Sequence, residues 1–172
     1  MPVNSRINKA GLSTVQKNQL RRALNEKVAI QVIASDIVSA ASTNTTLVDI
    51  RASGTGTSYL VFPVKAYKTY VVSAALDGVC TTNNGIKLGF TGPTAGIIRG
   101  RIMDDGTYAL YDAFTDVATE AAAAGTALSA TFQFAYRPTA DGYLKAQWAE
   151  QTNHADTITL KAGSFVKVEE VA

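Results

Sequence analysis

Cysteine and histidine are almost absent from this sequence, which has one of each among 172 residues. A single cysteine, Cys80, excludes an intrachain disulfide and a cysteine-based zinc cluster. Because Cys80 lies in a strand-like run, we interpret it as a small core residue and not as a nucleophile. His154 alone would have to serve any Ser-His-Asp system or histidine-bound metal, so we interpret it as an exposed loop residue. The sequence therefore predicts no metal, no cofactor and no catalytic residue.

Long apolar runs are also absent. No window of about 18 apolar residues occurs, so no membrane-spanning helix is predicted. The first residues, MPVNSRINKAGLSTVQ, contain no apolar stretch long enough for a signal peptide. We therefore expect synthesis in a cytoplasm and no membrane partner. Aliphatic and aromatic residues are plentiful, and one domain of this size buries roughly 70% of its unfolded surface, which is enough for a core without disulfides.

Motifs that carry chemistry are equally scarce. Asp104-Asp105-Gly106 contains two carboxylates, but neighbouring side chains on a turn diverge, so a hairpin turn is the better interpretation. Ser53-Gly54-Thr55-Gly56 has no following Lys and helix, as a phosphate-binding loop requires, and is predicted to be a connector. No feature places two carboxylates across a groove. The sequence thus predicts a protein that is not an enzyme.

Charge is sparse, at 17% of residues, and unevenly distributed. The net charge is +2, but residues 1–27 contain six basic residues against Glu26, which gives this N-terminal arm +5 and leaves −3 for the rest. Such a basic arm is typical of an interaction tail for an acidic surface, either nucleic acid or protein; a solvated helix face is the alternative. The acidic body has no basic stripe, so we expect no nucleic-acid partner.

The arm is predicted to be helical. Ser13 and Gln16 form an S-x-x-Q capping box, which favours a helix over residues 14–27. Leu20 and Leu24 would form a narrow apolar stripe on it, and one stripe needs a partner surface to be stable. Residues 28–45 are apolar at first and then rich in Ser, Thr and Ala, so they could form a strand or an extended connector.

From about residue 46 the hydrophobic period changes to two, which indicates strands with one buried and one exposed face. In ATFQFAY at 130–136, mostly aromatic residues alternate with small or polar ones. The predicted strands cover residues 57–62, 69–76, 86–90, 98–102, 107–114, 130–136, 144–148, 157–161 and 164–171.

The connections between these strands carry turn chemistry. Asn84-Gly85, Asp105-Gly106 and Asp141-Gly142 are dipeptides typical of hairpins, and Thr91-Gly92-Pro93 predicts another sharp reversal. Residues 116–125, DVATEAAAAG, have helix-forming composition, and we expect a short surface helix or loop there. Eight to ten short strands with turns between them predict an antiparallel, jelly-roll-like β-sandwich over 46–172, preceded by an anchor and connector over 1–45.

Part of the sequence resembles a β-sandwich domain that is common in virion proteins of tailed bacteriophages. The resemblance covers about residues 46–171, and it is carried by LVFPV at 60–64, residues 67–76, IKLGFTGP at 86–93, LKAQWA at 144–149 and TLKAGS at 159–164. It implies a head fibre, capsid decoration or tail-fibre module, made in the host cytoplasm and usually trimeric. The chain lacks the long shaft repeats of a tail fibre, which favours a compact projection on the capsid surface.

On this interpretation the arm attaches the sandwich to the major capsid protein or to other virion subunits. The anchor candidates are the basic and apolar residues of the predicted helix and the segment before it: Arg6, Lys9, Lys17, Leu20, Arg21, Arg22 and Leu24. One alternative is a receptor- or carbohydrate-binding tail-fibre module, with a host-surface glycan as partner and exposed tyrosines as contacts. Another is a polysaccharide depolymerase, which would need the facing carboxylates that the sequence does not place.

Overall fold

The computed structural model of the chain describes residues 27–39, 45–51, 58–81, 85–104, 106–120, 127–152 and 157–171. The predicted helix, apart from Lys27, and all seven anchor candidates lie outside these residues, as do His154 and residues 121–125. Within the described ranges the chain forms strands, turns and bends, and no helix. The prediction of a mainly β fold with antiparallel pairing is therefore confirmed, and the helical arm stays a prediction.

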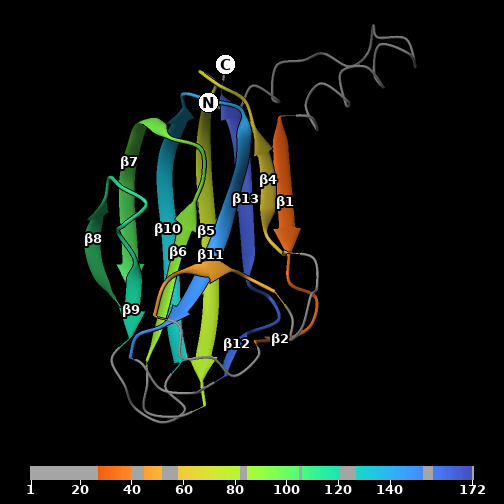
Figure 1. Cartoon of the computed structure of the whole chain (residues 1–172), viewed down its shortest axis with the longest axis vertical. Helices are drawn as coiled ribbons and strands as arrows, with labels where there is room; N and C mark the ends of the chain where they lie inside the picture. Colours follow the sequence, from red (N-terminus) through yellow and green to blue (C-terminus); the bar gives the residue numbers. More distant parts are fainter. Residues whose placement is uncertain are drawn as a thin grey trace, which may run out of the picture.

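The strands form two antiparallel sheets that pack face to face (Figure 1). One sheet has eight strands: β1 (Val28–Val32), β2 (Ile37–Val38), β5 (Thr69–Cys80), β7 (Ala95–Asp104), β8 (Thr107–Tyr111), β10 (Ala127–Pro138), β12 (Ile158–Leu160) and β13 (Phe165–Val171). Its main path runs β1-β13-β5-β10-β7-β8, and β12 pairs with both β2 and β5. The other sheet has five: β3 (Val48–Asp49), β4 (Val61–Val64), β6 (Ile86–Thr91), β9 (Ala118–Glu120) and β11 (Gly142–Glu150).

The period of two in the sequence corresponds to the burial of alternate side chains. Along β10 every second residue, from Leu128 to Pro138, is buried, and the residues between them are exposed or half-buried. The same alternation runs along β5, and the two strands pair so that Phe132 lies opposite Ala74. Cys80 is buried at the end of β5, which confirms that it is a core residue.

Aromatic rings join the two sheets at the centre of the core. Phe90 of β6 packs edge-to-face against Phe132 and Phe134 of β10, with ring centroids 5.1 and 5.3 Å apart. Tyr111 is the last residue of β8, and its ring centroid lies 4.6 Å from that of Phe134, which belongs to the same sheet. Because Phe90 belongs to the five-stranded sheet and the other rings to the eight-stranded sheet, this cluster holds the two layers together.

Short connections mostly carry the chain from one sheet to the other, which differs from the hairpin prediction. Gly106, at φ 84°, does lie between two paired strands, β7 and β8, as a hairpin requires. By contrast, the connections that contain Gly85, Gly92-Pro93 and Asp141-Gly142 each join strands of different sheets. Turn residues specify a reversal but not the sheet that receives the next strand. From β4 to β7 and from β8 to β12, successive strands alternate between sheets, as in a jelly roll.

Two segments form strands where the sequence left a strand and a connector both open, or indicated a helix or loop. The first, Val28–Val32, forms β1 at the edge of the larger sheet, so the sheet begins before the boundary expected at residue 46. Four of its five residues are exposed, which explains why the sequence shows no alternation there. The second, Ala118–Glu120, forms β9 beside β6, although a helix or loop was expected. Ala118 is fully buried, and such tertiary contacts override the helix propensity of this composition.

Candidate functional site

Reactive side chains do not gather in the part of the chain that the structure describes. The described ranges contain no group of three or more His, Cys, Asp or Glu residues that could hold a metal ion. Nor do these ranges include a helix long and apolar enough to span a bilayer. Asp104 and Gly106 lie in the β7–β8 hairpin, as expected.

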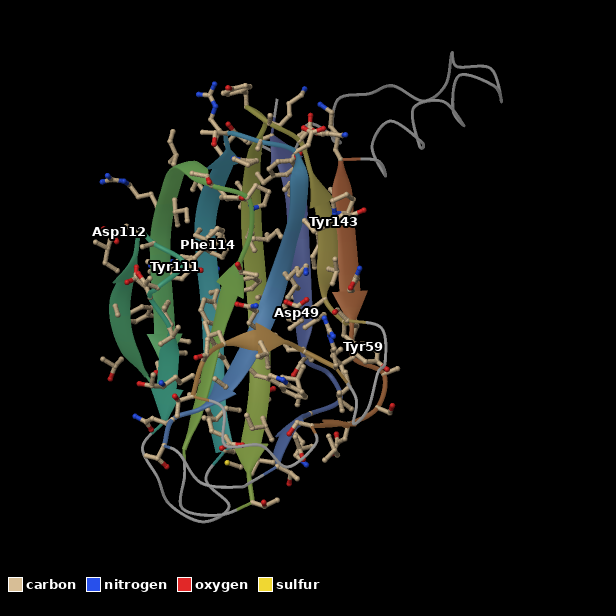
Figure 2. All side chains as sticks on the ribbon, viewed as in Figure 1. Asp49, Tyr59, Tyr111, Asp112, Phe114 and Tyr143 are labelled. Atoms are coloured by element: carbon tan, nitrogen blue, oxygen red, sulfur yellow. The ribbon has the colours of Figure 1, made fainter. Side chains whose placement is uncertain are left out.

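A polar cluster around Asp49 lies on the outer face of the five-stranded sheet (Figure 2). Asp49 Oδ2 accepts hydrogen bonds from Lys145 Nζ at 2.7 Å and from Ser58 Oγ at 3.3 Å, and Oδ1 accepts one from Gln147 Nε2 at 3.1 Å. Arg51 completes the cluster, with one guanidinium nitrogen 3.5 Å from Asp49 Oδ2 and Nε donating to Ser58 Oγ at 3.1 Å. We call these five residues the Asp49 cluster.

The Asp49 carboxylate is held in its ionised form. Burial raises the pKa of Asp49, but hydrogen bonds from Lys145 and Gln147 outweigh this effect, and the net pKa is lowered. All of its partners are donors, and its side chain is only 10% exposed. A general acid would need a raised pKa, and a nucleophile would need an accessible oxygen. The hydrogen bonds around Asp49 therefore suit a structural role better than proton transfer.

The Asp49 cluster fastens the segment that contains Leu47 and Asp49 to the outer face of the five-stranded sheet. Asp49 lies in β3, opposite Gln147 of β11. A Cβ added to Gly89 of β6 would lie 3.1 Å from Leu47, so this glycine lets that segment pack closely. The sequence does not reveal the cluster, because Asp49 and Lys145 are 96 residues apart and neither belongs to a motif.

Two other aspartates fasten connections between strands. Asp141 accepts hydrogen bonds from the Ala66 backbone N–H and from Lys65 Nζ, both at 2.8 Å. Asp36 likewise accepts from the backbone N–H of Ala162 at 2.8 Å and from Lys161 Nζ at 2.9 Å. These bonds lower the pKa of both carboxyl groups. The hydrogen bonds to each of these aspartates are therefore fully formed above the ordinary pKa of an aspartate. They are lost as the pH falls through the lowered pKa.

A side-chain amide links the two sheets at their common margin. Gln31 of β1 donates through Nε2 to the Val61 carbonyl oxygen at 2.7 Å, and its Oε1 accepts from the Val61 backbone N–H at 3.1 Å. The amide thus pairs with β4 as a strand backbone would, which joins an edge of the larger sheet to the smaller one.

Lys27, the last residue of the N-terminal arm, lies beside the end of β13. The Glu170 backbone N–H donates to the Lys27 carbonyl oxygen at 2.7 Å, and Val28 lies opposite Glu169. The turns between β4 and β5 and between β10 and β11 lie at the same end, because Val171 pairs with Thr69 and the β4–β11 pairing starts there (Figure 1). We call this the arm end of the sandwich.

The exposed tyrosines do not form one patch. Tyr67 and Tyr143, 67% and 57% exposed, lie at the arm end, in the β4–β5 turn and at the start of β11. Tyr59 lies between β3 and β4, well away from Tyr143 (Figure 2). Tyr108 lies on the opposite layer, on the outer face of the eight-stranded sheet, where Arg101 packs over its ring. A glycan platform of clustered aromatics was one expectation, and only Tyr67 and Tyr143 share an end.

Comparisons with known proteins leave the family open. No family model matches the sequence, and no curated protein matches it. Among solved structures, an Eiger TNF from S. frugiperda has 10% identity and a TM-score of 0.48, over 84% of this chain and 92% of that chain. The CBM22-1-GH10 modules of the Clostridium thermocellum xylanase 10B have 10% identity and a TM-score of 0.28, over 83% of this chain and 26% of that one. The Gx strain of infectious bursal disease virus gives 12% identity and a TM-score of 0.23, over 84% of this chain and 41% of that one. At these scores, the similarities assign neither a family nor a function to the chain.

Proposed function

We propose that the chain is a structural protein of a tailed-bacteriophage particle, a head fibre or decoration protein attached to the capsid surface through its basic N-terminal arm. The observation that carries the proposal is the separation of charge along the chain. The arm has a net charge of +5 and the remainder −3. Lys27, the last residue of the arm, lies at one end of the sandwich, so a capsid subunit that bound the arm would hold the sandwich by that end.

The sandwich itself supports a structural role. Its aspartates at positions 36, 49 and 141 are hydrogen-bonded to lysines and fasten connections between strands. The resemblance of residues 46–171 to phage virion domains points to the same class of function. That the protein is not an enzyme stays a prediction, which a depolymerase assay would test.

The alternative, a carbohydrate-binding tail-fibre module, fits the position of the tyrosines less well. Tyr67 and Tyr143 lie at the arm end, so in an attached protein they would face the particle and not the host. They are better placed to add an apolar contact to the docking of the arm. Binding to a glycan array that is lost in Tyr143→Ala would favour the alternative.

Deletion of residues 1–26 tests the attachment. The truncated chain keeps Lys27 and the whole described sandwich, so we expect a folded β protein by circular dichroism that no longer co-purifies with particles. Exposed charges are screened beyond about 8 Å at physiological ionic strength, so binding of the full-length chain should also weaken as salt rises.

A matched pair of variants separates charge from arm structure. Arg21→Gln with Arg22→Gln should lower occupancy on particles several-fold, whereas Arg21→Lys with Arg22→Lys should keep it near the level of the unaltered chain. Normal incorporation of the truncated chain would show that the arm is not the anchor.

A further inference from the structure

The outer face of the eight-stranded sheet carries exposed apolar side chains along both of its edges. Six strands lie side by side in it, in the order β1-β13-β5-β10-β7-β8 (Figure 1). Its most exposed apolar side chains lie on the two edge strands, where Leu110 is 65% exposed, Tyr108 64%, Val32 60% and Ile30 57%. An antiparallel sheet that faces water on one side normally presents polar side chains there. Neither β1 nor β8 contains a charged residue, although charges are the usual protection of an edge strand.

The side chains in the middle of this face are mostly small. Ala75 and Ser73 of β5 lie opposite Thr131 and Gln133 of β10, and Ala135 follows two residues later. Six strands about 4.8 Å apart make a face about 24 Å wide. Over about 30 Å of strand length the face covers on the order of 700 Å², close to the roughly 800 Å² that each partner buries in a standard interface.

The cross-strand register places matching residues at opposite margins of the face. One row runs from Val32 through Phe165, Ala75, Thr131 and Met103 to Tyr108. The next row runs from Ile30 through Lys167, Ser73, Gln133 and Arg101 to Leu110. A third runs from Glu169 through Val71 and Ala135 to Arg99.

A two-fold axis parallel to the strands, in front of the boundary between β5 and β10, would exchange the two margins of every row. Tyr108 of one copy would then face Val32 of the other, and Leu110 would face Ile30. Arg99, which has no ion pair among the described residues, would face Glu169. Ala75 would meet Thr131, where small side chains permit close approach. The one unfavourable meeting is Arg101 with Lys167, and each is already bonded within its own chain, to Gln133 at 3.0 Å and to Glu169 at 2.7 Å.

We propose that this face binds a second copy of the chain about such an axis, which makes a dimer in place of the trimer that the resemblance to phage virion proteins implies. The observations that favour a second copy are the matching of apolar and charged residues across the rows and the area of the face. A hollow of about 130 Å³, lined by Arg101, Met103, Tyr108, Thr131 and Gln133, lies on the same face and can receive an apolar side chain. An axis parallel to the strands also leaves both arm ends on the same side, although the proposal does not depend on attachment to a particle.

Sedimentation of the purified full-length chain at micromolar concentration tests the proposal. We expect a dimer that Thr131→Arg converts to a monomer, with at least about 30-fold weaker association, because the substitution buries a bulky charge at the centre of the face. The matched control is Thr91→Arg, since Thr91 is also half-buried and faces outward, but on the five-stranded sheet. It should leave the dimer unchanged, and circular dichroism should show both variants folded.

A charge exchange gives a second, independent measurement. Arg99→Glu and Glu169→Arg should each weaken the dimer, and the double variant should restore it, because it recreates the pair with its signs reversed. A monomer of the unaltered chain at these concentrations, a trimer, equal effects of Thr131→Arg and Thr91→Arg, or a double variant no better than the single ones would each overturn the proposal. Since no particle enters these measurements, their failure would leave the proposed attachment untouched.

Discussion

Replacing Gly100 by alanine is expected to lower the free energy of unfolding by more than about 3 kcal/mol. Gly100 lies in β7, opposite Phe134 of β10 and Tyr111 of β8. A Cβ at this position would overlap the carbonyl oxygen of Gln133 and the Cα of Phe134. These are backbone atoms of a central strand, so they cannot move aside as a flexible side chain would. Urea unfolding monitored by circular dichroism measures the loss.

Gly96→Ala is the matched control for this substitution. Gly96 lies in the same strand, but an added Cβ would meet only the Thr139 methyl group at 3.3 Å and the Arg137 carbonyl oxygen at 3.6 Å. We expect a change within about 1 kcal/mol, because the Thr139 side chain can adjust. Equal losses for Gly96→Ala and Gly100→Ala would show that β7 does not pack against β10 as described.

Phe132→Ala is expected to cost about 3–5 kcal/mol, the range for removing a fully buried aromatic side chain. Phe132 is inaccessible to solvent and packs edge-to-face against Phe90 of the other sheet and against Tyr111. Its loss leaves a cavity between the two layers and removes both aromatic pairs. Because self-association would add to apparent stability, all variants are compared at one protein concentration.

Tyr143→Ala provides the comparison for Phe132→Ala. It also removes an aromatic ring from a strand, but this ring is 57% exposed on the outer face of the five-stranded sheet. A change within about 1 kcal/mol is expected. If Tyr143→Ala proved as costly as Phe132→Ala, the assignment of inner and outer faces to β10 and β11 would be wrong.

The strands were predictable because burial on one face leaves a period of two. The expected strand over 130–136 lies inside β10, and its aromatic residues point into the core as the alternation indicated. Strand ends were less predictable. The strand expected over 107–114 ends at Tyr111, because Asp116 Oδ2 accepts from the backbone N–H groups of Asp112 and Ala113, both at 2.9 Å, and turns the chain there (Figure 2). The strand expected over 57–62 starts at Val61, since Leu60 has a positive φ of 55°.

Sheet membership could not be predicted, since it depends on contacts between distant residues. Asn84-Gly85 and Asp141-Gly142 have the composition of hairpin turns, yet each carries the chain to the other sheet. Gly142 is required for close approach and not for its φ, because a Cβ there would lie 2.5 Å from the Pro93 ring. The Asp49 cluster was missed for a similar reason. Lysines and aspartates spread along a chain show no spacing that reveals which pairs will meet.

Localisation of the chain on purified phage particles by cryo-electron microscopy tests the account most directly. We predict density for a two-layered sandwich on the outer surface of the capsid, with the end that holds Lys27 and Val171 toward the shell. Particles that lack this density, or a sandwich that contacts the shell through its opposite end, would contradict it.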